Sequence, residues 1–317
     1  MQDPLQQAQF VAQRVAELHA DGVALDKIAV LYRAHSHSME LQVELTKRQI
    51  PYVVRSGVRF FEQAHIKDVL AYLRVLHNPR DGLSWQRLLR LQPGIGRRSA
   101  VAVAEELSKE QAPLKKLSDG VFENLRGRQA RAMSEFAGRF LPLVSASGKE
   151  PGRLVEMVLE CGYRDILPLV YQNFSEREED IEHLARYAEK YDTLADFLAE
   201  LHLLEAVGAE TLTLDGEREE ALVLSTVHQA KGLEWNVVFV LGLCEGWFPH
   251  SFSLSEEGGL EEERRLFYVA ITRARDELYL CSPLASDKGN RLVVMRSSRF
   301  LDEIHPACER WAVERAR

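Results

Sequence analysis

The sequence predicts an α/β protein, in which a parallel sheet flanked by helices is interrupted by an inserted all-helical subdomain. Two features carry this prediction. Short apolar runs of strand length alternate with helical periodicity near both ends of the chain, whereas the stretch 91–210 has mostly helical periodicity and no convincing strand. With 317 residues, of which 46% are hydrophobic, the chain can form one large or two ordinary globular domains.

The N-terminal part of the chain alternates between the two kinds of element. Apolar residues recur at helical spacing from Pro4 to Ala20, and Ile28–Tyr32 is a short apolar run typical of a buried strand. A second helix at about 38–48 and a second strand at Tyr52–Val54 follow, then a helix at about 66–76. The order strand, helix, strand predicts a parallel pair of strands joined by a crossover.

Strands return after the helical middle. The clearest helices of the middle are 154–160, 178–191 and 194–204, and later strands are expected at 221–225, 237–241 and 277–281, with a helix at about 260–273. The sheet is therefore built from both ends of the chain. We assign residues 1–90 and 211–317 to the α/β domain, and residues 91–210 to the helical subdomain.

Composition limits the possible classes of protein. A formal net charge of -8 argues weakly against a protein that coats nucleic acid through bulk positive charge, but a local basic groove stays possible. The four cysteines form no CxxC pair and no zinc-like cluster, which favours free thiols in a reducing cytoplasm. The chain has no signal peptide and no apolar run of transmembrane length, so we expect a cytoplasmic protein without membrane contact.

The densest group of polar residues follows the strand expected at 221–225. Thr226, His228, Lys231 and Glu234 lie in the loop beyond its carboxyl end, where ligands of open parallel sheets bind. Gly232 would let the backbone approach a phosphate or adopt a positive φ. A solvated loop would explain any one of these residues, but the whole group favours a functional site.

Arginines end the helix expected at 260–273. Arg273 and Arg275 could be cations favoured by the helix dipole, or an arginine finger that neutralises charge on a transferred phosphoryl group. Composition alone does not choose between the two. Tyr32 and Arg33 end the first strand, a location that suits a ligand, although an ordinary strand-end tyrosine and a surface arginine explain them as well.

Two long stretches resemble motifs of superfamily 1A DNA helicases of the UvrD, PcrA and Rep type. The stretch from Thr226 to Glu234 resembles motif V, and the stretch from Glu262 to Ala274 resembles motif VI, at about the separation found in that family. Further matching stretches are Ala29–Arg33, Ile50–Tyr52, 56–61, Ile66–Asp68, Ala71–Arg74 and Asn78–Pro79, which look like motif IV and its continuation, and Gly246–His250 and Ser298–Leu301. The resemblance implies the second RecA-like domain of such a helicase, with a helical insert.

The resemblance also implies nucleotide contacts. Tyr32 would stack on adenine, Glu234 would bind the ribose, and Arg33 and Arg273 would both reach the γ-phosphate as catalytic arginines. The two guanidinium groups would therefore converge on one triphosphate. Lys231 belongs to motif V but receives no single role.

Contacts with DNA follow from the same resemblance. Thr226 and His228 would touch the backbone of single-stranded DNA, and His250 would lie in the same path. In the insert, the turn Gly94-Ile95-Gly96 with Arg97 offers backbone N–H groups and a cation to a phosphate, and its counterpart contacts the duplex at a fork. A plain helix-initiating turn remains the alternative.

The chain lacks the motif that holds nucleotide phosphates. No GxxxxGK[ST] is present: Gly148-Lys149 is followed by Glu150, and Leu143 stands where the first glycine should be. No buried strand ends in an acidic pair for magnesium. ATP and Mg²⁺ are therefore expected only in a full-length parent, whose N-terminal P-loop RecA-like domain would supply the metal ligands; this chain alone is predicted to be inactive.

The resemblance as a whole implies the C-terminal half of an ATP-dependent 3′–5′ DNA helicase or translocase. The segment Ser286–Asn290, near which relatives often place a base-stacking aromatic, has none. Two alternatives stay open. A non-enzymatic DNA-binding or regulatory module would have no P-loop domain upstream, and the helicase part of a recombination helicase–nuclease would be followed by a nuclease domain.

Overall fold

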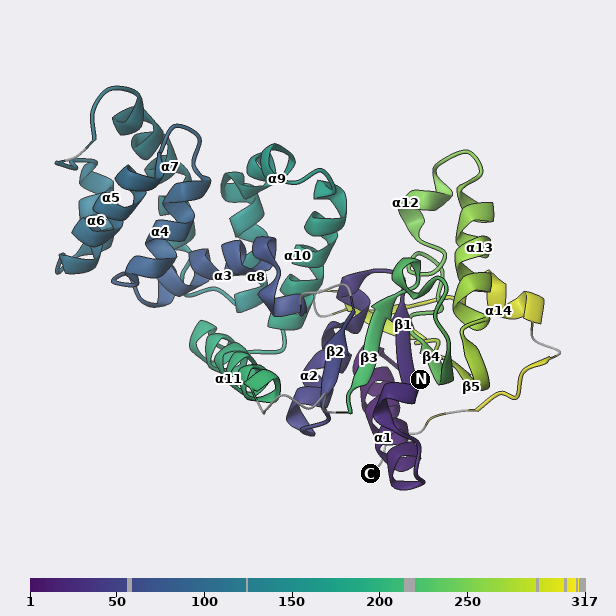
Figure 1. Ribbon diagram of the computed structural model, residues 1–317. Coiled ribbons are helices and arrows are strands. Elements are labelled where there is room, and N and C mark those ends of the chain that lie inside the picture. The colour runs from purple at the N-terminus through teal and green to yellow at the C-terminus, as the bar shows by residue number, and fades with distance from the viewer. Residues whose placement is uncertain are drawn as a thin grey trace. The chain divides into compact units, whose positions relative to one another are not determined.

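The computed structural model describes residues 1–55, 59–123, 125–213, 220–288, 291–304, 307–311 and 313, without the side chains of 205–213, 286–288 and 291–292. Ser56 and Gly57, part of one matching stretch, lie outside the described residues. The chain divides into two compact units (Figure 1): unit 1 is Met1–Phe60 with Leu203–Arg317, and unit 2 is Phe61–His202.

Unit 1 contains a five-stranded parallel sheet in the order β2-β3-β1-β4-β5. The strands are β1 (Ile28–Tyr32), β2 (Tyr52–Val54), β3 (Leu222–Thr226), β4 (Trp235–Val240) and β5 (Ala274–Leu280). Both ends of the chain thus contribute to one sheet, and the α/β fold class predicted from the sequence is confirmed.

Helices cover both faces of this sheet (Figure 1). On one face, α1 (Pro4–Ala20) and α2 (Met39–Lys47) pack against alternate residues of the central strands. On the other, α13 (Gly259–Ile271) packs over the remaining alternate residues, together with the loop after β3 and the short helix α14 (Arg299–Ile304). Side chains of successive strand residues point to opposite faces, so a strand buried on both sides reads as a continuous apolar run.

The beginning of α1 shows how the sequence sets a helix boundary. Asp3 has extended backbone angles, and its carboxylate accepts a hydrogen bond from the Gln6 N–H at 2.7 Å. Pro4 occupies the first helical position, where its missing N–H costs nothing. The helix therefore starts where the sequence predicts.

The sheet order differs from the sequence prediction in one respect. β1 and β2 are parallel, as expected, but they are not neighbours, because β3 from the distant C-terminal half lies between them. The prediction of a directly paired β1 and β2 is therefore wrong. The main chain of β1 pairs instead with β3 on one side and β4 on the other.

The C-terminal part of unit 1 also departs from the expected pattern. β5 begins at Ala274, three residues before the predicted strand, because it is an edge strand whose first residues are polar and exposed. A two-stranded antiparallel ribbon, β6 (Ala285–Lys288) with β7 (Arg291–Val294), was not predicted from the sequence.

Unit 2 is helical throughout its described residues. Its helices are α3 (Ala64–His77), α4 (Gly82–Leu91), α5 (Arg97–Lys109), α6 (Pro113–Asp119), α7 (Arg128–Ser145), α8 (Pro151–Val158), α9 (Arg164–Val170), α10 (Phe174–Ala188) and the first half of α11 (Leu194–Thr213). Aromatic side chains form part of its core, where Trp85 packs against Phe136 and Phe140. Residues 61–90, which the sequence assigns to the α/β domain, belong to this unit.

A buried polar cluster ties the helices of unit 2 together. The Asp68 carboxylate, 2% exposed, accepts hydrogen bonds from Arg87 Nε at 2.6 Å and from the Tyr163 hydroxyl at 2.7 Å. Close by, the buried His65 ring lies 3.2 Å from Asp180 and 2.6 Å from Arg177. Each buried charge thus has a partner, as low-dielectric interiors require.

Candidate functional site

The carboxyl ends of the central strands bring several predicted residues together. Tyr32, the last residue of β1, is in register with Thr226, the last residue of β3. The Val227 N–H donates to the Tyr32 carbonyl at 3.0 Å and so extends the pairing of the two strands by one hydrogen bond, and the chain turns at His228–Ala230. His228 follows on a short 3-10 turn and is exposed, whereas Thr226 is only 8% exposed. The side of the sheet where the strands end, called the carboxyl edge below, therefore presents polar groups from two adjacent strands.

His250 reaches the same edge from the loop after β4. The loop is anchored by Phe248, whose fully buried ring meets the Phe267 and Phe300 rings edge to face. The Phe248–Pro249 peptide bond is cis. Gly246 has a φ of 92°, a conformation that favours glycine, and its carbonyl accepts the Ser251 N–H at 3.1 Å. A buried ring and a tight turn thus fix the backbone on which His250 lies.

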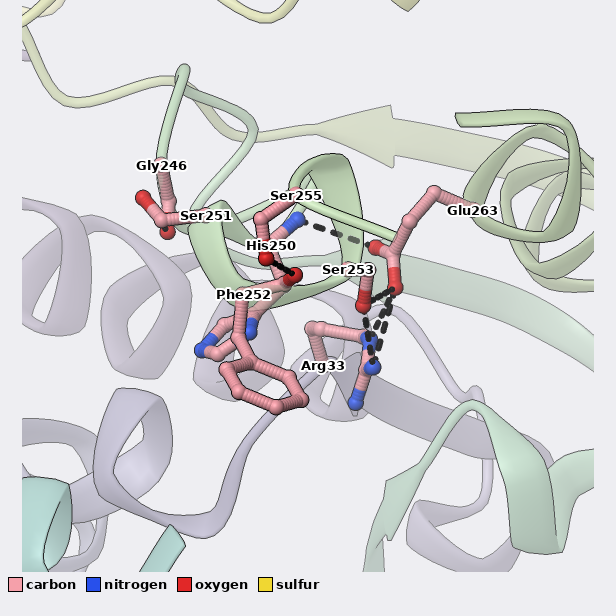
Figure 2. A network of polar contacts seen from close by, with 8 residues as sticks. All are labelled: Arg33, Gly246, His250, Ser251, Phe252, Ser253, Ser255 and Glu263. Atoms are coloured by element: carbon pink, nitrogen blue, oxygen red, sulfur yellow. Dashed lines mark hydrogen bonds and ion pairs between the residues drawn. The ribbon is translucent and has the colours of Figure 1, made fainter. Parts of the chain in front are cut away.

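A buried carboxylate joins this loop to β1. Glu263 of α13 is 1% exposed, and its Oε1 accepts hydrogen bonds from Arg33 Nε at 2.9 Å and Ser253 Oγ at 2.9 Å. Arg33 Nη2 lies 2.9 Å from the same oxygen. The other oxygen accepts the His250 N–H at 3.0 Å, and Figure 2 shows these contacts around Glu263.

Sequence reasoning missed Glu263. It is the last of three consecutive glutamates at the start of α13, and the other two are exposed. Its spacing carries the signal, because Glu263 lies three and four residues before the buried Leu266 and Phe267 on the same stripe of the helix. A buried carboxylate on an apolar stripe predicts a cation partner, here Arg33.

Tyr32 does not fit its predicted role. Its side chain is 0% exposed and packs in the core between the sheet and the helices α1 and α2. A ring that stacks on adenine must present a face to solvent before the base arrives. The prediction that Tyr32 binds adenine is therefore contradicted by its burial.

The opposite side of the sheet, where the strands begin, carries the other predicted nucleotide residues. Glu234 and Arg273 immediately precede β4 and β5, and the Trp235 N–H donates to the Arg273 carbonyl at 2.9 Å. The Glu234 carboxylate accepts a hydrogen bond from Arg275 Nε at 3.0 Å, and both side chains are about half exposed, at 49% and 61%. An acid and two arginines thus share this edge.

Arg273 differs from Arg33 in its electrostatic surroundings. Its guanidinium donates to the Val269 and Leu233 carbonyls at 3.0 and 2.9 Å and to the Thr272 hydroxyl at 2.9 Å. None of its partners among the described residues is a carboxylate. The positive charge of Arg273 is therefore held in place without being neutralised, whereas that of Arg33 is paired with Glu263.

The structure does not bring Arg33 and Arg273 together. Arg33 follows the carboxyl end of β1, and Arg273 precedes the amino end of β5, in a sheet whose strands are all parallel. At about 3.3 Å per residue, the register separates the two backbones by roughly 25–30 Å along the strands. Both guanidinium groups cannot reach one phosphoryl group within this unit, so the predicted convergence is wrong.

The loop from Val227 to Glu234 links the two edges. It leaves β3 at the edge that carries Thr226 and His228, crosses the face covered by α13, and enters β4 at the edge that carries Glu234. Val227 and Ala230 are fully buried against that face, whereas Lys231 is exposed. Polar groups at both edges are thus part of one short, anchored segment.

The predicted turn of unit 2 has the expected local geometry. Gly94 has a φ of 94°, Gly96 is the N-cap residue of α5, and the Ile95 N–H donates to the Gln92 carbonyl at 3.1 Å. Gly96 and Arg97 are exposed. The first N–H groups of a 13-residue helix and an exposed arginine therefore share one surface.

Neither a metal cluster nor a membrane-crossing helix occurs in the part of the chain that the structure describes. No group of three or more His, Cys, Asp or Glu side chains there is arranged to hold a metal ion. No described helix is both long and apolar enough to span a bilayer.

Known proteins similar to this chain agree on one family. A model of the UvrD-like helicase C-terminal domain matches residues 1–126 and 170–283. The chain is 34% identical to the ATP-dependent DNA helicase PcrA of Bacillus subtilis, with 94% of this chain and 42% of the relative covered. It is 33% identical to DNA helicase II of Escherichia coli, with 96% and 44% covered. The chain therefore spans less than half the length of these relatives.

Proposed function

The chain belongs to the UvrD-like helicase C-terminal domain family, and from this premise we propose that it is the C-terminal half of an ATP-dependent DNA helicase or translocase that moves 3′ to 5′. The relatives are named as ATP-dependent DNA helicases, and this chain corresponds to 42–44% of their length. A P-loop RecA-like domain would supply the phosphate-binding lysine and the magnesium ligands. The single observation that carries the proposal is that motif V crosses from one edge of the parallel sheet to the other and ends at Glu234, at the same edge as Arg273 of motif VI.

On the nucleotide side, we assign the roles to Arg273 and Glu234. Arg273 offers a positioned guanidinium with no carboxylate partner among the described residues, which suits an anion arriving from another domain. Glu234 offers a half-exposed carboxylate that could accept hydrogen bonds from ribose hydroxyls. When bound, ATP supplies the phosphoryl group whose developing charge an arginine neutralises, an effect worth roughly 10³–10⁵ in rate.

On the DNA side, the proposal assigns Thr226, His228 and His250. These residues come from the end of β3 and from the loops after β3 and β4, all at the carboxyl edge of the sheet, and hydroxyl and imidazole groups hydrogen-bond to phosphate oxygens. Arg33 is reassigned from a nucleotide ligand to a positioning residue at this edge. Its ion pair with Glu263 holds the loop that carries His250.

The loop 227–234 gives a physical route for coupling. A shift of Glu234 when nucleotide binds would be transmitted along a segment of eight residues, anchored by the buried Val227 and Ala230, to Thr226 and His228. A ligand shifts an equilibrium between two states only through its differential contacts with them. Closure of the P-loop domain on ATP at the edge that carries Glu234 would therefore change the affinity for DNA at the edge that carries Thr226 and His228.

In unit 2, we propose that Gly94, Gly96 and Arg97 contact a duplex phosphate at a fork. The exposed start of α5 offers N–H groups, and the helix dipole favours an anion there. This role depends on unit 2 alone and is separate from the motor function proposed for unit 1.

ATP hydrolysis by the purified chain tests the assignment of domains. Because the phosphate-binding lysine and magnesium ligands would lie on another domain, the chain alone is expected to hydrolyse ATP no faster than buffer, with or without single-stranded DNA. Joined to its P-loop domain in the full-length parent, it should support DNA-stimulated hydrolysis. Robust turnover by the isolated chain would contradict the proposal.

A further inference from the structure

An exposed aromatic side chain without an assigned role lies beside the proposed DNA path. Phe252 belongs to the short helix α12 (Ser251–Leu254) and is 58% exposed. Single exposed hydrophobic residues are common on protein surfaces, but a ring held exposed beside a proposed DNA path is available to stack on a partner.

The backbone that carries Phe252 is held on both sides. The residues before and after it are fixed by Glu263, which accepts the His250 N–H at 3.0 Å and the Ser253 hydroxyl at 2.9 Å. Gly259 packs directly on this turn: a Cβ at that position would lie 1.7 Å from the Ser253 carbonyl oxygen. The exposure of Phe252 is therefore imposed by the packing of its neighbours.

We propose that Phe252 is a stacking platform for one base of single-stranded DNA, next to the contact made by His250. This inference rests on the proposed function of the carboxyl edge. Figure 2 shows the Phe252 ring projecting from the α12 turn away from Glu263, on the side where His250 and Arg33 also lie. A ring at that position meets the base of a nucleotide whose phosphate is bound by the neighbouring loop.

The charges near Phe252 favour a base over a phosphate as the occupant. Glu256 and Glu257 follow α12 and are exposed, and the charge of Arg33 is paired with Glu263. Acidic side chains repel the DNA backbone, but stacking needs only the π face of a ring and accepts any base. Phe252 would add affinity without sequence preference.

The test measures binding of a fluorescent oligothymidylate to the chain by anisotropy at low salt. Loss of one stacked base is expected to weaken binding by roughly 5- to 150-fold in Phe252→Ala. Phe252→Trp should retain the affinity, and its added indole fluorescence should be quenched by the stacked base. Phe174→Ala, which removes a 41% exposed aromatic from the other unit, should bind like the wild type.

An oligonucleotide of the same length with abasic sites distinguishes stacking from a merely structural effect. The wild type should bind it more weakly than oligothymidylate, whereas Phe252→Ala should bind both about equally, because the lost contact is with the base. Unchanged oligothymidylate binding in Phe252→Ala, together with weakened binding in His250→Ala, would overturn the stacking role but leave the DNA edge intact. No binding by the wild-type chain would overturn both.

Discussion

Replacement of Glu263 by glutamine tests the buried network that holds the carboxyl edge of the sheet. The carboxylate is 1% exposed, and the Arg33 side chain that it pairs with is 16% exposed. Glutamine keeps the shape of the side chain but removes the negative charge. Its amide can accept hydrogen bonds at one atom only, so either the His250 N–H or the Arg33 and Ser253 donors must face an NH₂ group.

The magnitude follows from the burial of the pair. Removing one partner of a buried ion pair costs about 3–5 kcal/mol, because the other charge is left uncompensated. We take the lower end, about 3 kcal/mol, since Arg33 is partly accessible to water. By comparison, Glu262→Gln removes an exposed carboxylate, 61% accessible and paired with Arg265, and should cost less than about 1 kcal/mol.

Native-state hydrogen exchange is the suitable assay, because it reports unit 1 separately from the helical unit. Amides of β1 are buried on both faces of the sheet, and we expect them to exchange through unfolding of the whole unit. A loss of about 3 kcal/mol corresponds to a fall of roughly 150-fold in their protection. A fall of less than about threefold, or an equal fall in Glu262→Gln, would refute the reasoning.

Two further predictions concern other parts of unit 1. Burial raises the pKa of the Cys244 and Cys281 thiols to about 12, so both stay protonated at pH 8. Neither thiol should react with a disulfide reagent in the native state, whereas the exposed Cys308 should react at once. The hydrogen bonds and ion pair with Arg299 lower the pKa of Glu245; the resulting stabilisation is present above the ordinary pKa of a glutamate and is lost as the pH falls through the lowered value. In denaturant titrations, the free energies of unfolding of Glu245→Gln and wild type should therefore differ by less than about 1 kcal/mol at pH 7 and become equal below roughly pH 4. A difference in the free energy of unfolding that grows on acidification would contradict this.

Local sequence patterns predicted most elements of the sheet. β1 and β2 have the boundaries expected from their apolar runs. β1 is buried on both faces, which admits few polar residues, whereas β2 is an edge strand in which Val53 is exposed. The predicted start of β5 is three residues too late, because the first half of this edge strand contains exposed polar residues that resemble a loop. The position of β3 between β1 and β2 has no local signal, because it depends on a pairing between residues about 190 positions apart.

The candidate site shows the same limit. Patterns correctly marked the loop after β3 as a polar, strand-terminal segment, and the burial of Val227 and Ala230 explains how it is fixed. They did not reveal that Arg33 and Arg273 lie at opposite edges. That fact follows from strand direction: one arginine ends a strand and the other precedes one, and in a parallel sheet these positions are far apart.

In the proposed mechanism, nucleotide acts at the edge of the sheet that carries Arg273, and DNA acts at the edge that carries Arg33. Single-turnover ATP hydrolysis by the full-length parent, saturated with single-stranded DNA, tests it most directly. Arg273→Ala should slow the chemical step by roughly 10³-fold or more with little change in ATP affinity, while Arg33→Ala should retain most of that rate and weaken DNA binding. A normal rate in Arg273→Ala, or the large loss of rate in Arg33→Ala instead, would contradict the account.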